Sequence, residues 1–330
     1  MLLLLACAPG VLPASSGAVD AATDTADTAA PDTADSADSS PNDSAADSAD
    51  SGDTADSGDT ADTARPEPTT GPCAAYAAAV AMGDVDDPAL DELSGLAVSR
   101  QNPGILWTHE DSGGAAELYA LDFTGATVAT IHVDGVENHD WEDIAIGPCS
   151  AGWCLVVGEI GTANYEHALL VVEEPLLTGA MEFTLTPDVE PFTFPGDPED
   201  AEGLALFPDG TPLVVSKRDD ATAGLYTLPA GASGLVWQAD IATGAPGESL
   251  TAMATAADLS TDGATLLVRT YLHLYSVDVA DLTAPGTPDS LAFAIELQGE
   301  AVAWDPNQGG FWQVGEGTGR TLYYTGCAAE

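Results

Sequence analysis

Basic residues are scarce in this sequence. Of its 330 residues only six are lysine or arginine, whereas 54 are aspartate or glutamate, and the formal net charge is −48. A surface of that sign repels phosphate groups, which argues against binding of nucleic acid or anionic membranes through charge. The composition fits an exported protein or one from a saline habitat.

Several sequence motifs of common enzymes are also missing. The chain contains no Gly-x-Ser-x-Gly elbow, no phosphate-cradling glycine loop and no His-Glu-x-x-His helix. These absences exclude a serine hydrolase of that type, a P-loop NTPase and a zincin. The opening apolar run, MLLLLACAPG, is far shorter than the roughly 20 residues that span a bilayer.

That opening run contains the first of only five cysteines. Leu4-Leu5-Ala6-Cys7 resembles the lipobox of bacterial lipoproteins, and the alternative is a start methionine followed by a few leucines. The resemblance implies that residues 1–6 are a removed signal segment and that Cys7 is acylated. It also implies an exported protein of the bacterial cell envelope, at the outer membrane or cell surface, that contacts the membrane through this lipid only.

A low-complexity segment follows, and we predict that residues 7–72 form a tether. Residues 18–64 contain thirteen aspartates among Thr, Ala and Ser and no basic residue. Such a segment buries too little apolar surface to fold and repels itself, so we expect a disordered spacer. A calcium-binding repeat tract would need glycine-rich nonapeptide spacing, which is absent.

The remaining four cysteines predict two disulfides. Cys73 and Cys327 stand at the two limits of the predicted domain, residues 73–327, with 328–330 as a tail, whereas Cys149 and Cys154 flank a short SAGW segment. A zinc site is the alternative, but Cys-x-x-Cys spacing and neighbouring histidines are lacking.

Within that domain one pattern recurs five times, and it predicts the fold. Each unit has an apolar opening segment, a second apolar run about a dozen residues later, and a third run that closes the unit. The opening segments read SGLAVS (94–99), EDIAIG (142–147), EGLALF (202–207), TAADLS (255–260) and EAVAWD (300–305). Short strands repeated at this period are typical of a β-propeller.

A fourth strand for each unit is found in ATVATIHV, MEFTLTP, GLVWQADI and SLAFAIEL, and AYAAAVAM (75–82) can complete the last unit. We therefore predict an all-β, single-domain propeller of five four-stranded blades, closed by pairing of terminal strands. A sixth blade within 161–201 is the alternative. We expect a monomer.

The repeat places five residues at one equivalent position, at the start of each innermost strand. This ring comprises Ser94, Glu142, Glu202, Thr255 and Glu300. Three carboxylates around a narrow axis need protonation or a cation. Oxygen ligands without His or Cys favour calcium, ahead of magnesium or manganese. The alternative is that these glutamates accept hydrogen bonds from backbone amides and channel water.

A second set of polar residues ends the second strands, on the same face of the propeller. It comprises His109, Glu110, Asp111, Glu159, Lys217, Arg218, Arg269 and Glu316. His109, Glu110 or Asp111 are candidates for a general base. Lys217, Arg218 and Arg269 are candidates to hold a small anion. The alternatives are a structural His109 and salt bridges from the three cations to Glu110, Glu159 and Glu316.

The order of the ring residues, Ser94, Glu142, Glu202, Thr255 and Glu300, resembles that of the calcium-activated nucleotidases, the apyrase family. The segment DWEDIA (140–145) also resembles a signature of that family. The resemblance implies a five-bladed propeller with a central calcium ion, and Thr255 departs from the serine of that family. The phrases SGLAVSRQNPGILWTHEDSGG, DWEDIAIGPC, VGEIG and GEAVAWDP resemble a group of secreted bacterial propeller proteins of unknown activity.

The sequence is compatible with two functions. The first is a binding module with a structural ion that recognises a small anionic ligand or a protein partner on one face. The second is a metal-dependent hydrolase of a phosphorylated or other anionic small molecule. The domain has only five basic residues, which disfavours recognition of a di- or triphosphate and favours the binding module.

Overall fold

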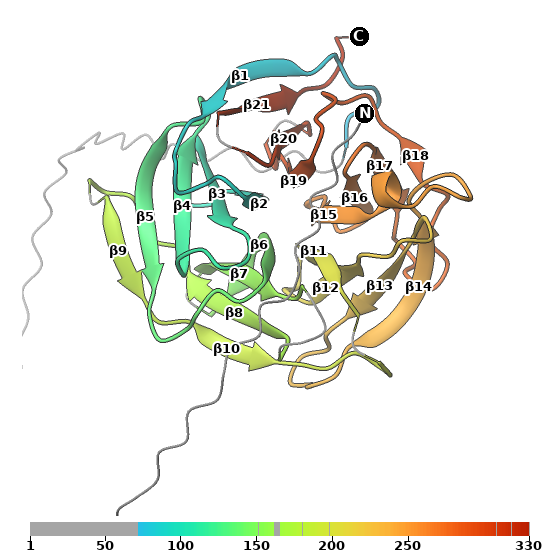
Figure 1. The fold of residues 1–330 in the computed structure, drawn as a ribbon, viewed down its shortest axis with the longest axis horizontal. Helices are drawn as coiled ribbons and strands as arrows, with labels where there is room; N and C mark the ends of the chain where they lie inside the picture. The colour runs from blue at the N-terminus through green and yellow to red at the C-terminus, as the bar shows by residue number, and fades with distance from the viewer. Residues whose placement is uncertain are drawn as a thin grey trace, which may run out of the picture. The chain divides into compact units, whose positions relative to one another are not determined.

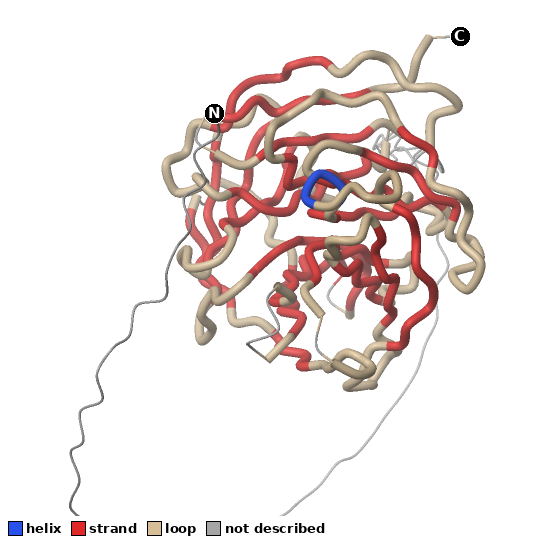
Figure 2. The backbone as a smooth tube through the Cα atoms, turned by 45° about the vertical axis from the view of Figure 1, so that its right-hand side comes forward, coloured by secondary structure: helices blue, strands red, loops and turns tan. Residues whose placement is uncertain are grey.

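The computed structural model describes residues 72–329, apart from 151, 162–165, 180, 198, 308 and 318. The predicted signal segment, the acylation site Cys7 and nearly all of the predicted tether lie outside the described residues. Within the described part the chain is almost entirely strands and loops, with one single-turn helix, η1 (Leu250–Ala252) (Figure 2). No helix in this part is long and apolar enough to cross a membrane.

Five sheets stand around a central channel and form a five-bladed β-propeller (Figure 1). Each blade begins at the channel with its innermost strand. Blade 1 contains β2 (Leu93–Val98), β3 (Ile105–Glu110), β4 (Glu117–Asp122) and β5 (Thr127–Val133). Blade 2 contains β6 (Trp141–Cys149), β7 (Gly152–Glu159), β8 (Ala168–Glu173) and β10 (Asp188–Pro191).

The other three blades follow the same order. Blade 3 contains β11 (Ala201–Leu206), β12 (Pro212–Ser216), β13 (Thr222–Thr227) and β14 (Val236–Ala242). Blade 4 contains β15 (Ala254–Leu259), β16 (Thr265–Thr270), β17 (Leu274–Asp278) and β18 (Asp289–Ser290). Blade 5 contains β19 (Gly299–Trp304), β20 (Phe311–Gly315), β21 (Arg320–Thr325) and, from the start of the domain, β1 (Val80–Val85).

The core is divided among the five blade interfaces. Five buried hydrophobic clusters each join one pair of neighbouring blades, from the Leu96–Trp312 cluster of blades 1 and 5 to the Trp107–Trp141 cluster of blades 1 and 2. The innermost strands contact one another in a closed cycle, so β2 and β19 are buried along their whole length. This burial explains why the opening segments are continuous apolar runs rather than alternating ones.

The ring closes as the sequence predicts. β1 pairs antiparallel with β21, Tyr76 forms a bridge with Cys327, and the Cys73–Cys327 disulfide lies beside them. The predicted closing strand at 75–82 thus begins later and extends to Val85. The second predicted disulfide, Cys149–Cys154, joins β6 to β7.

Two predicted outer strands are wrong. MEFTLTP does not complete blade 2: β9 (Glu182–Leu185) pairs in parallel with β5 and adds a fifth strand to blade 1, whereas β10 pairs with β8. SLAFAIEL is strand only at its start, in β18. Beyond it, the Gln313 side chain exchanges two hydrogen bonds with the Ala294 backbone and so replaces a strand ladder.

Candidate functional site

The ring residues lie where β-bulges interrupt the innermost strands. The register of β6 with β7 passes from Trp141 to Asp143 and skips Glu142, and Glu202, Thr255 and Glu300 are skipped in the same way. In blade 1 the irregularity falls just after Ser94. A bulge bends the strand and re-aims its side chain. The repeat therefore includes a backbone feature that directs each of these positions toward the channel.

Five carboxylates gather at this end of the channel, and we call them the acidic cluster. Asp111, Asp140 and Glu142 form one group, and Glu142, Asp200 and Glu202 form a second. In each group the candidate ligand atoms lie within 4.8 Å of one another. Asp111 follows β3, while the other residues stand at the starts of β6 and β11, so three blades contribute to the cluster.

Burial makes the charged state of the cluster costly. Glu142 and Glu202 are each only 6% exposed. Burial raises the pKa of Glu142 well above its usual range, and the nearby charge of Asp111 raises it further. Burial likewise raises the pKa of Asp111 to about 6. Among the described residues, none donates a hydrogen bond to the Glu142 carboxylate, which is shared by both groups.

One cation of the chain already lies in this cluster. The ammonium group of Lys217 forms an ion pair with Glu202. The backbone amide of Lys217 donates a hydrogen bond to the carbonyl of Asp200 over 2.8 Å. The ammonium group also lies 5.4 Å from the ring centroid of Tyr271. Lys217 therefore offsets the charge of Glu202, and its charge also lowers the pKa of Glu142 and of Asp200.

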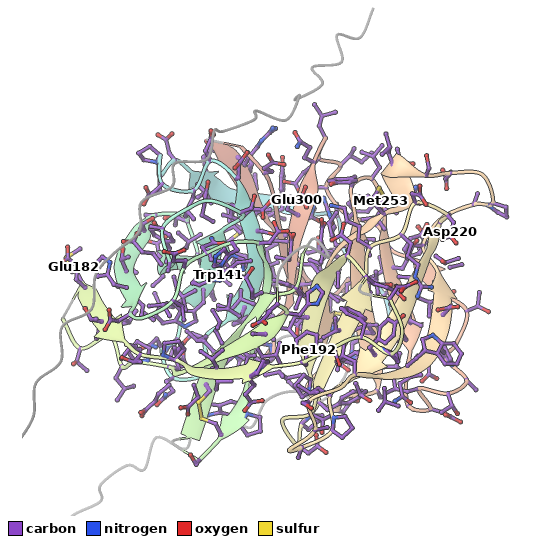
Figure 3. All side chains as sticks on the ribbon, turned by 60° about the horizontal axis from the view of Figure 1, so that its bottom comes forward. Trp141, Glu182, Phe192, Asp220, Met253 and Glu300 are labelled. Carbon is purple, nitrogen blue, oxygen red and sulfur yellow. A yellow bond between two sulfur atoms is a disulfide. The ribbon has the colours of Figure 1, made fainter. Side chains whose placement is uncertain are left out.

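Glu300 lies toward the middle of the molecule, whereas Glu182 lies at its outer edge (Figure 3). The carboxyl of Glu300 is outside the two close groups of carboxylates, although the charges of Lys217 and Asp111 act on it. Burial raises the pKa of Glu300 to about 8. The third ring carboxylate thus belongs to the same charged end of the channel without belonging to the closest set of oxygens.

The two ring hydroxyls form bonds between blades. Ser94 donates its hydroxyl proton to the carbonyl of Glu142, and Thr255 donates to the carbonyl of Gly299 over 2.6 Å. Both bonds join an innermost strand to the next innermost strand. A threonine serves as well as a serine here, because only the hydroxyl is used.

The second set of polar residues does not converge as a unit. His109 is fully buried, its Nδ1 lies 2.9 Å from the carbonyl of Glu110, and burial lowers its pKa to about 4. Glu110 accepts a hydrogen bond from the backbone of Glu92, and burial raises its pKa to about 7. Glu159 accepts from the Asp140 amide, while Glu316 accepts from the side chain of Gln298.

The alternative interpretation, salt bridges from the three cations to Glu110, Glu159 and Glu316, is wrong. Lys217 pairs with Glu202 and Arg218 pairs with Glu199 and Asp240, all from blade 3 or the loop before it. Arg269 is completely buried, bonds Glu296 over 3.0 Å and lies 5.0 Å from the ring of Phe293. Acids closer in the fold take these partners, so each of the three cations has a carboxylate of its own.

Sequence reasoning missed Asp140, Asp200 and Tyr271. Both aspartates carry a readable signal: each stands two residues before a ring glutamate, in Asp140-Trp141-Glu142 and Asp200-Ala201-Glu202. A bulge at the glutamate brings both side chains of this Asp-x-Glu motif to one place. Tyr271 has no such signal, because it lies in a loop whose position depends on the packing of blade 4.

Gly161 packs directly against the cluster. A Cβ at this position would lie 2.2 Å from Glu142 Oε1 and 2.6 Å from Asp140 Oδ2. Its backbone does not have a positive φ, so the requirement for glycine is the space beside the carboxylates.

Asp143, which follows Glu142 in β6, is completely buried between innermost strands. Its carboxylate accepts hydrogen bonds from the amides of Ile144, Leu204 and Ala257, which belong to blades 2, 3 and 4. The side chain therefore ties three innermost strands together.

No protein-family model and no curated protein matches this chain. Among solved structures it is similar to the PQQ-bound aldose sugar dehydrogenase from Streptomyces coelicolor, with a TM-score of 0.49 and 13% identity over 78% of this chain and 99% of that chain. It is also similar to glutaminyl cyclase from Myxococcus xanthus, with a TM-score of 0.46 and 11% identity over 78% of this chain and 100% of that chain. Similarities at this level assign no ligand or reaction to this chain, and they show no link to the apyrase family.

Proposed function

We propose that this chain is a β-propeller binding module whose acidic channel end holds a divalent cation, with calcium as the preferred ion. The observation that carries the proposal is the Glu142 carboxylate. It is buried, it receives no hydrogen bond from the described residues, and it belongs to both close groups of carboxylates. A buried carboxylate in that setting either stays protonated or binds a cation.

The donor set supports calcium. All five side chains of the cluster offer carboxylate oxygens, and calcium accepts six to eight oxygen ligands in flexible geometry. Thiolates, which favour softer metals, are absent because the four cysteines of the described part form two disulfides. Magnesium demands a stricter octahedron and is therefore the second choice.

The cations support a binding module over a hydrolase of anionic substrates. Lys217, Arg218 and Arg269 each pair with a carboxylate, and Arg269 is closed to solvent. A phosphorylated substrate at this acidic end would find the bound metal but, among the described residues, no lysine or arginine that is not already paired with a carboxylate of the protein. The ion then stabilises the channel and shapes the face that meets a ligand or protein partner.

A metal-dependent hydrolase is the second candidate, and one observation favours it. Glu110 adjoins Asp111 of the cluster, and burial raises its pKa to about 7, which suits a general base at neutral pH. Turnover of a simple ester or sugar phosphate that requires calcium and is lost in Glu110→Gln would establish this function and replace the binding module.

The disulfides support export, because such bonds persist in oxidising compartments. With the lipobox-like start, they lead us to propose a lipid-anchored protein of the bacterial cell envelope. Mass spectrometry of the membrane fraction tests this point: a peptide beginning at acylated Cys7 is expected. Recovery of unmodified Cys7 in that fraction would contradict it.

Binding of the cation is tested by measuring the melting temperature of the full chain in EDTA and in calcium. We expect calcium to raise the melting temperature, and Glu142→Gln with Glu202→Gln to remove the response. Glu182→Gln, an exposed position on β9, is the matched control and should respond as the parent does. Equal melting curves in EDTA and calcium, with no metal in the purified protein, would refute the proposal.

A further inference from the structure

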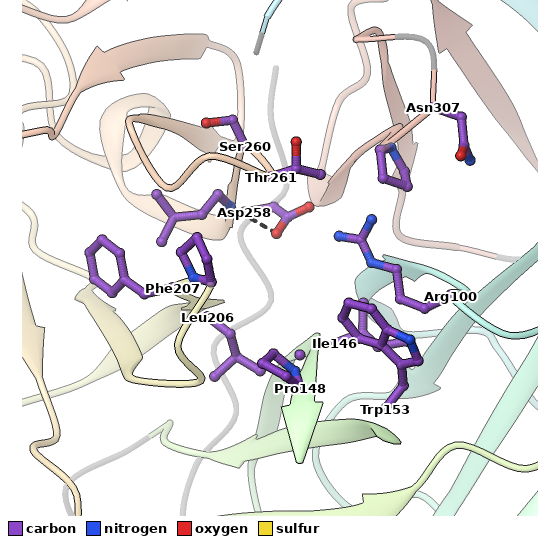
Figure 4. Close-up of a pocket in the computed structure, with 14 residues that line it drawn as sticks. Arg100, Ile146, Pro148, Trp153, Leu206, Phe207, Asp258, Ser260, Thr261 and Asn307 are labelled. Carbon is purple, nitrogen blue, oxygen red and sulfur yellow. Dashed lines mark hydrogen bonds between the residues drawn. The ribbon is translucent and has the colours of Figure 1, made fainter. Parts of the chain in front are cut away.

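A pocket lies at the other end of the channel from the acidic cluster. It has a volume of about 300 Å³, and all five blades contribute residues that follow or end their innermost strands (Figure 4). The ring residues stand at the starts of those same strands, six residues being about 20 Å of extended chain. The pocket and the acidic cluster are therefore separate sites on opposite faces.

Two opposite charges project into this pocket. Arg100, just after β2, lies with its guanidinium carbon 5.6 Å from the ring centroid of Trp153. Asp258, in β15, accepts hydrogen bonds from the amides of Leu259 and Trp304, which fix its carboxyl. The guanidinium and the carboxyl point toward the open centre from opposite sides (Figure 4).

The charge of Asp258 is available at neutral pH. Burial raises its pKa to about 6, while the charge of Arg100 opposes that rise. Above pH 7 the carboxyl is therefore mostly ionised. Arg100 has five N–H donors and can bind a ligand carboxylate in addition to its contacts within the protein.

The rest of the wall is mainly apolar. Ile146, Leu206 and Phe207 line it together with Trp153 and several prolines. Pockets of this kind, apolar with a few fixed polar groups, are the usual form of small-molecule sites, and 300 Å³ is at the small end of their range.

We propose that this pocket binds a small zwitterion of amino-acid or dipeptide size. Its carboxylate would meet Arg100, its ammonium group would meet Asp258, and an apolar side chain would pack on Leu206 and Phe207. The two opposite charges select a ligand that carries both signs, and the apolar wall selects a hydrophobic side chain. This ligand is independent of the cation proposed for the other end.

The test uses the ligand chemistry first, so that it does not depend on a variant that fails to fold. Leucine, phenylalanine and the dipeptide Leu-Phe are titrated into the full-length protein by calorimetry, beside their N-acetyl and C-amide derivatives. At least one free zwitterion should bind. Each blocked derivative should bind about ten-fold or more weakly, because one charge-assisted contact is lost.

Two variants then assign each charge. Arg100→Gln should remove the preference for the free acid over the amide, and Asp258→Asn should remove the preference for the free amine over the acetyl form. Arg320→Gln changes a cation on β21 that does not line the pocket and should leave both preferences unchanged. Binding of free and blocked forms with equal affinity, or binding by none of the free compounds, would overturn the proposal.

The same titration distinguishes this inference from the cation site. Glu142→Gln with Glu202→Gln should leave zwitterion binding intact. Loss of the calcium response with retained zwitterion binding is the expected pattern, and zwitterion binding that disappears with calcium removal would contradict the independence of the two sites.

Discussion

At the scale of single residues, the acidic cluster depends on which carboxylates point toward one another at the end of the channel. Glu142 is decisive because it belongs to both groups of carboxylates and lies almost entirely out of solvent. Lys217 supplies the only ammonium charge of the described chain, and it is paired with Glu202. Removing a carboxylate and removing the lysine should therefore have opposite effects on cation binding.

The first prediction concerns Lys217→Met. Without a divalent ion the variant should melt below the parent, because loss of one partner of a buried pair leaves Glu202 without its counter-charge. Calcium should stabilise the variant more than it stabilises the parent, because the lysine no longer competes for the carboxylates. Melting temperatures in EDTA and in calcium measure both effects. A weaker calcium response would mean that Lys217 helps to bind the ligand of this site.

The second prediction concerns Gly161→Ala. The added methyl group would lie within contact of Glu142 and Asp140, so the carboxylates must shift and calcium affinity should fall about ten-fold or more. Calorimetric titration with calcium measures the change. Gly234→Ala is the control, because a Cβ there meets nothing nearer than 3.8 Å. Unchanged affinity in Gly161→Ala would place the ion elsewhere.

At the scale of strands, the β-bulge is the feature that turns a repeat into a site. In four blades it lies at the ring residue and leaves that residue out of register, and in blade 1 it falls just after Ser94. The hydroxyls of Ser94 and Thr255 then join neighbouring innermost strands. In these two positions the ring stabilises the propeller, whereas the glutamates gather charge at its axis.

The third prediction separates these two roles. Thr255→Val keeps the shape but leaves the Gly299 carbonyl without its donor, so the free energy of unfolding should fall by about 1–3 kcal/mol. Thr255→Ser should behave as the parent. Calcium affinity should stay the same in both variants, as denaturant unfolding and titration will show. A selective loss of calcium affinity in Thr255→Val would make Thr255 a ligand.

The fourth prediction compares the two disulfides. Replacing Cys73 and Cys327 by serine should destabilise the propeller by about 5 kcal/mol and the Cys149–Cys154 pair by about 2 kcal/mol in the chain-entropy model, because the first bond closes a much longer loop. Denaturant unfolding of both double variants measures the difference. An equal cost for the two would mean that closure of β1 on β21 does not need the covalent bond.

Much of the fold could be predicted from the sequence, because a closed ring of innermost strands needs continuous apolar runs such as SGLAVS and EAVAWD. Outer strands were less predictable. Glu182–Leu185 is a short edge strand, and nothing in its own residues tells whether it pairs with β5 or with β8. The ring positions also followed from the repeat. The aspartates at 140 and 200 were missed because the bulge that brings them beside the glutamates is a backbone feature.

At the scale of the whole molecule, two ends of one channel have different chemistry. The end at the starts of the innermost strands gathers carboxylates, while the opposite end carries an apolar pocket with one arginine and one aspartate. The five-fold repeat produces both ends, because each innermost strand contributes residues to each of them.

The fifth prediction is a pH dependence of stability in the absence of divalent ions. Burial raises the pKa of Glu300 to about 8, from an ordinary value of 4.5. The folded state therefore holds its proton more tightly than the unfolded state between these values. The resulting stability is fully present below about pH 4.5 and is lost as the pH rises through about 8. Melting temperatures in EDTA should fall over this window, and a rise would contradict the assigned burial.

A crystal structure of the full-length protein grown in millimolar calcium, with manganese as an anomalous probe, tests whether the acidic cluster holds a divalent cation. We expect an anomalous peak beside Glu142, within the group of Asp111 and Asp140 or the group of Asp200 and Glu202, with carboxylate oxygens about 2.3–2.6 Å from calcium. In Glu142→Gln the peak should be absent. A cluster without any peak at saturating ion, or an ion bound by other residues, would show that the acidic cluster is not a cation site.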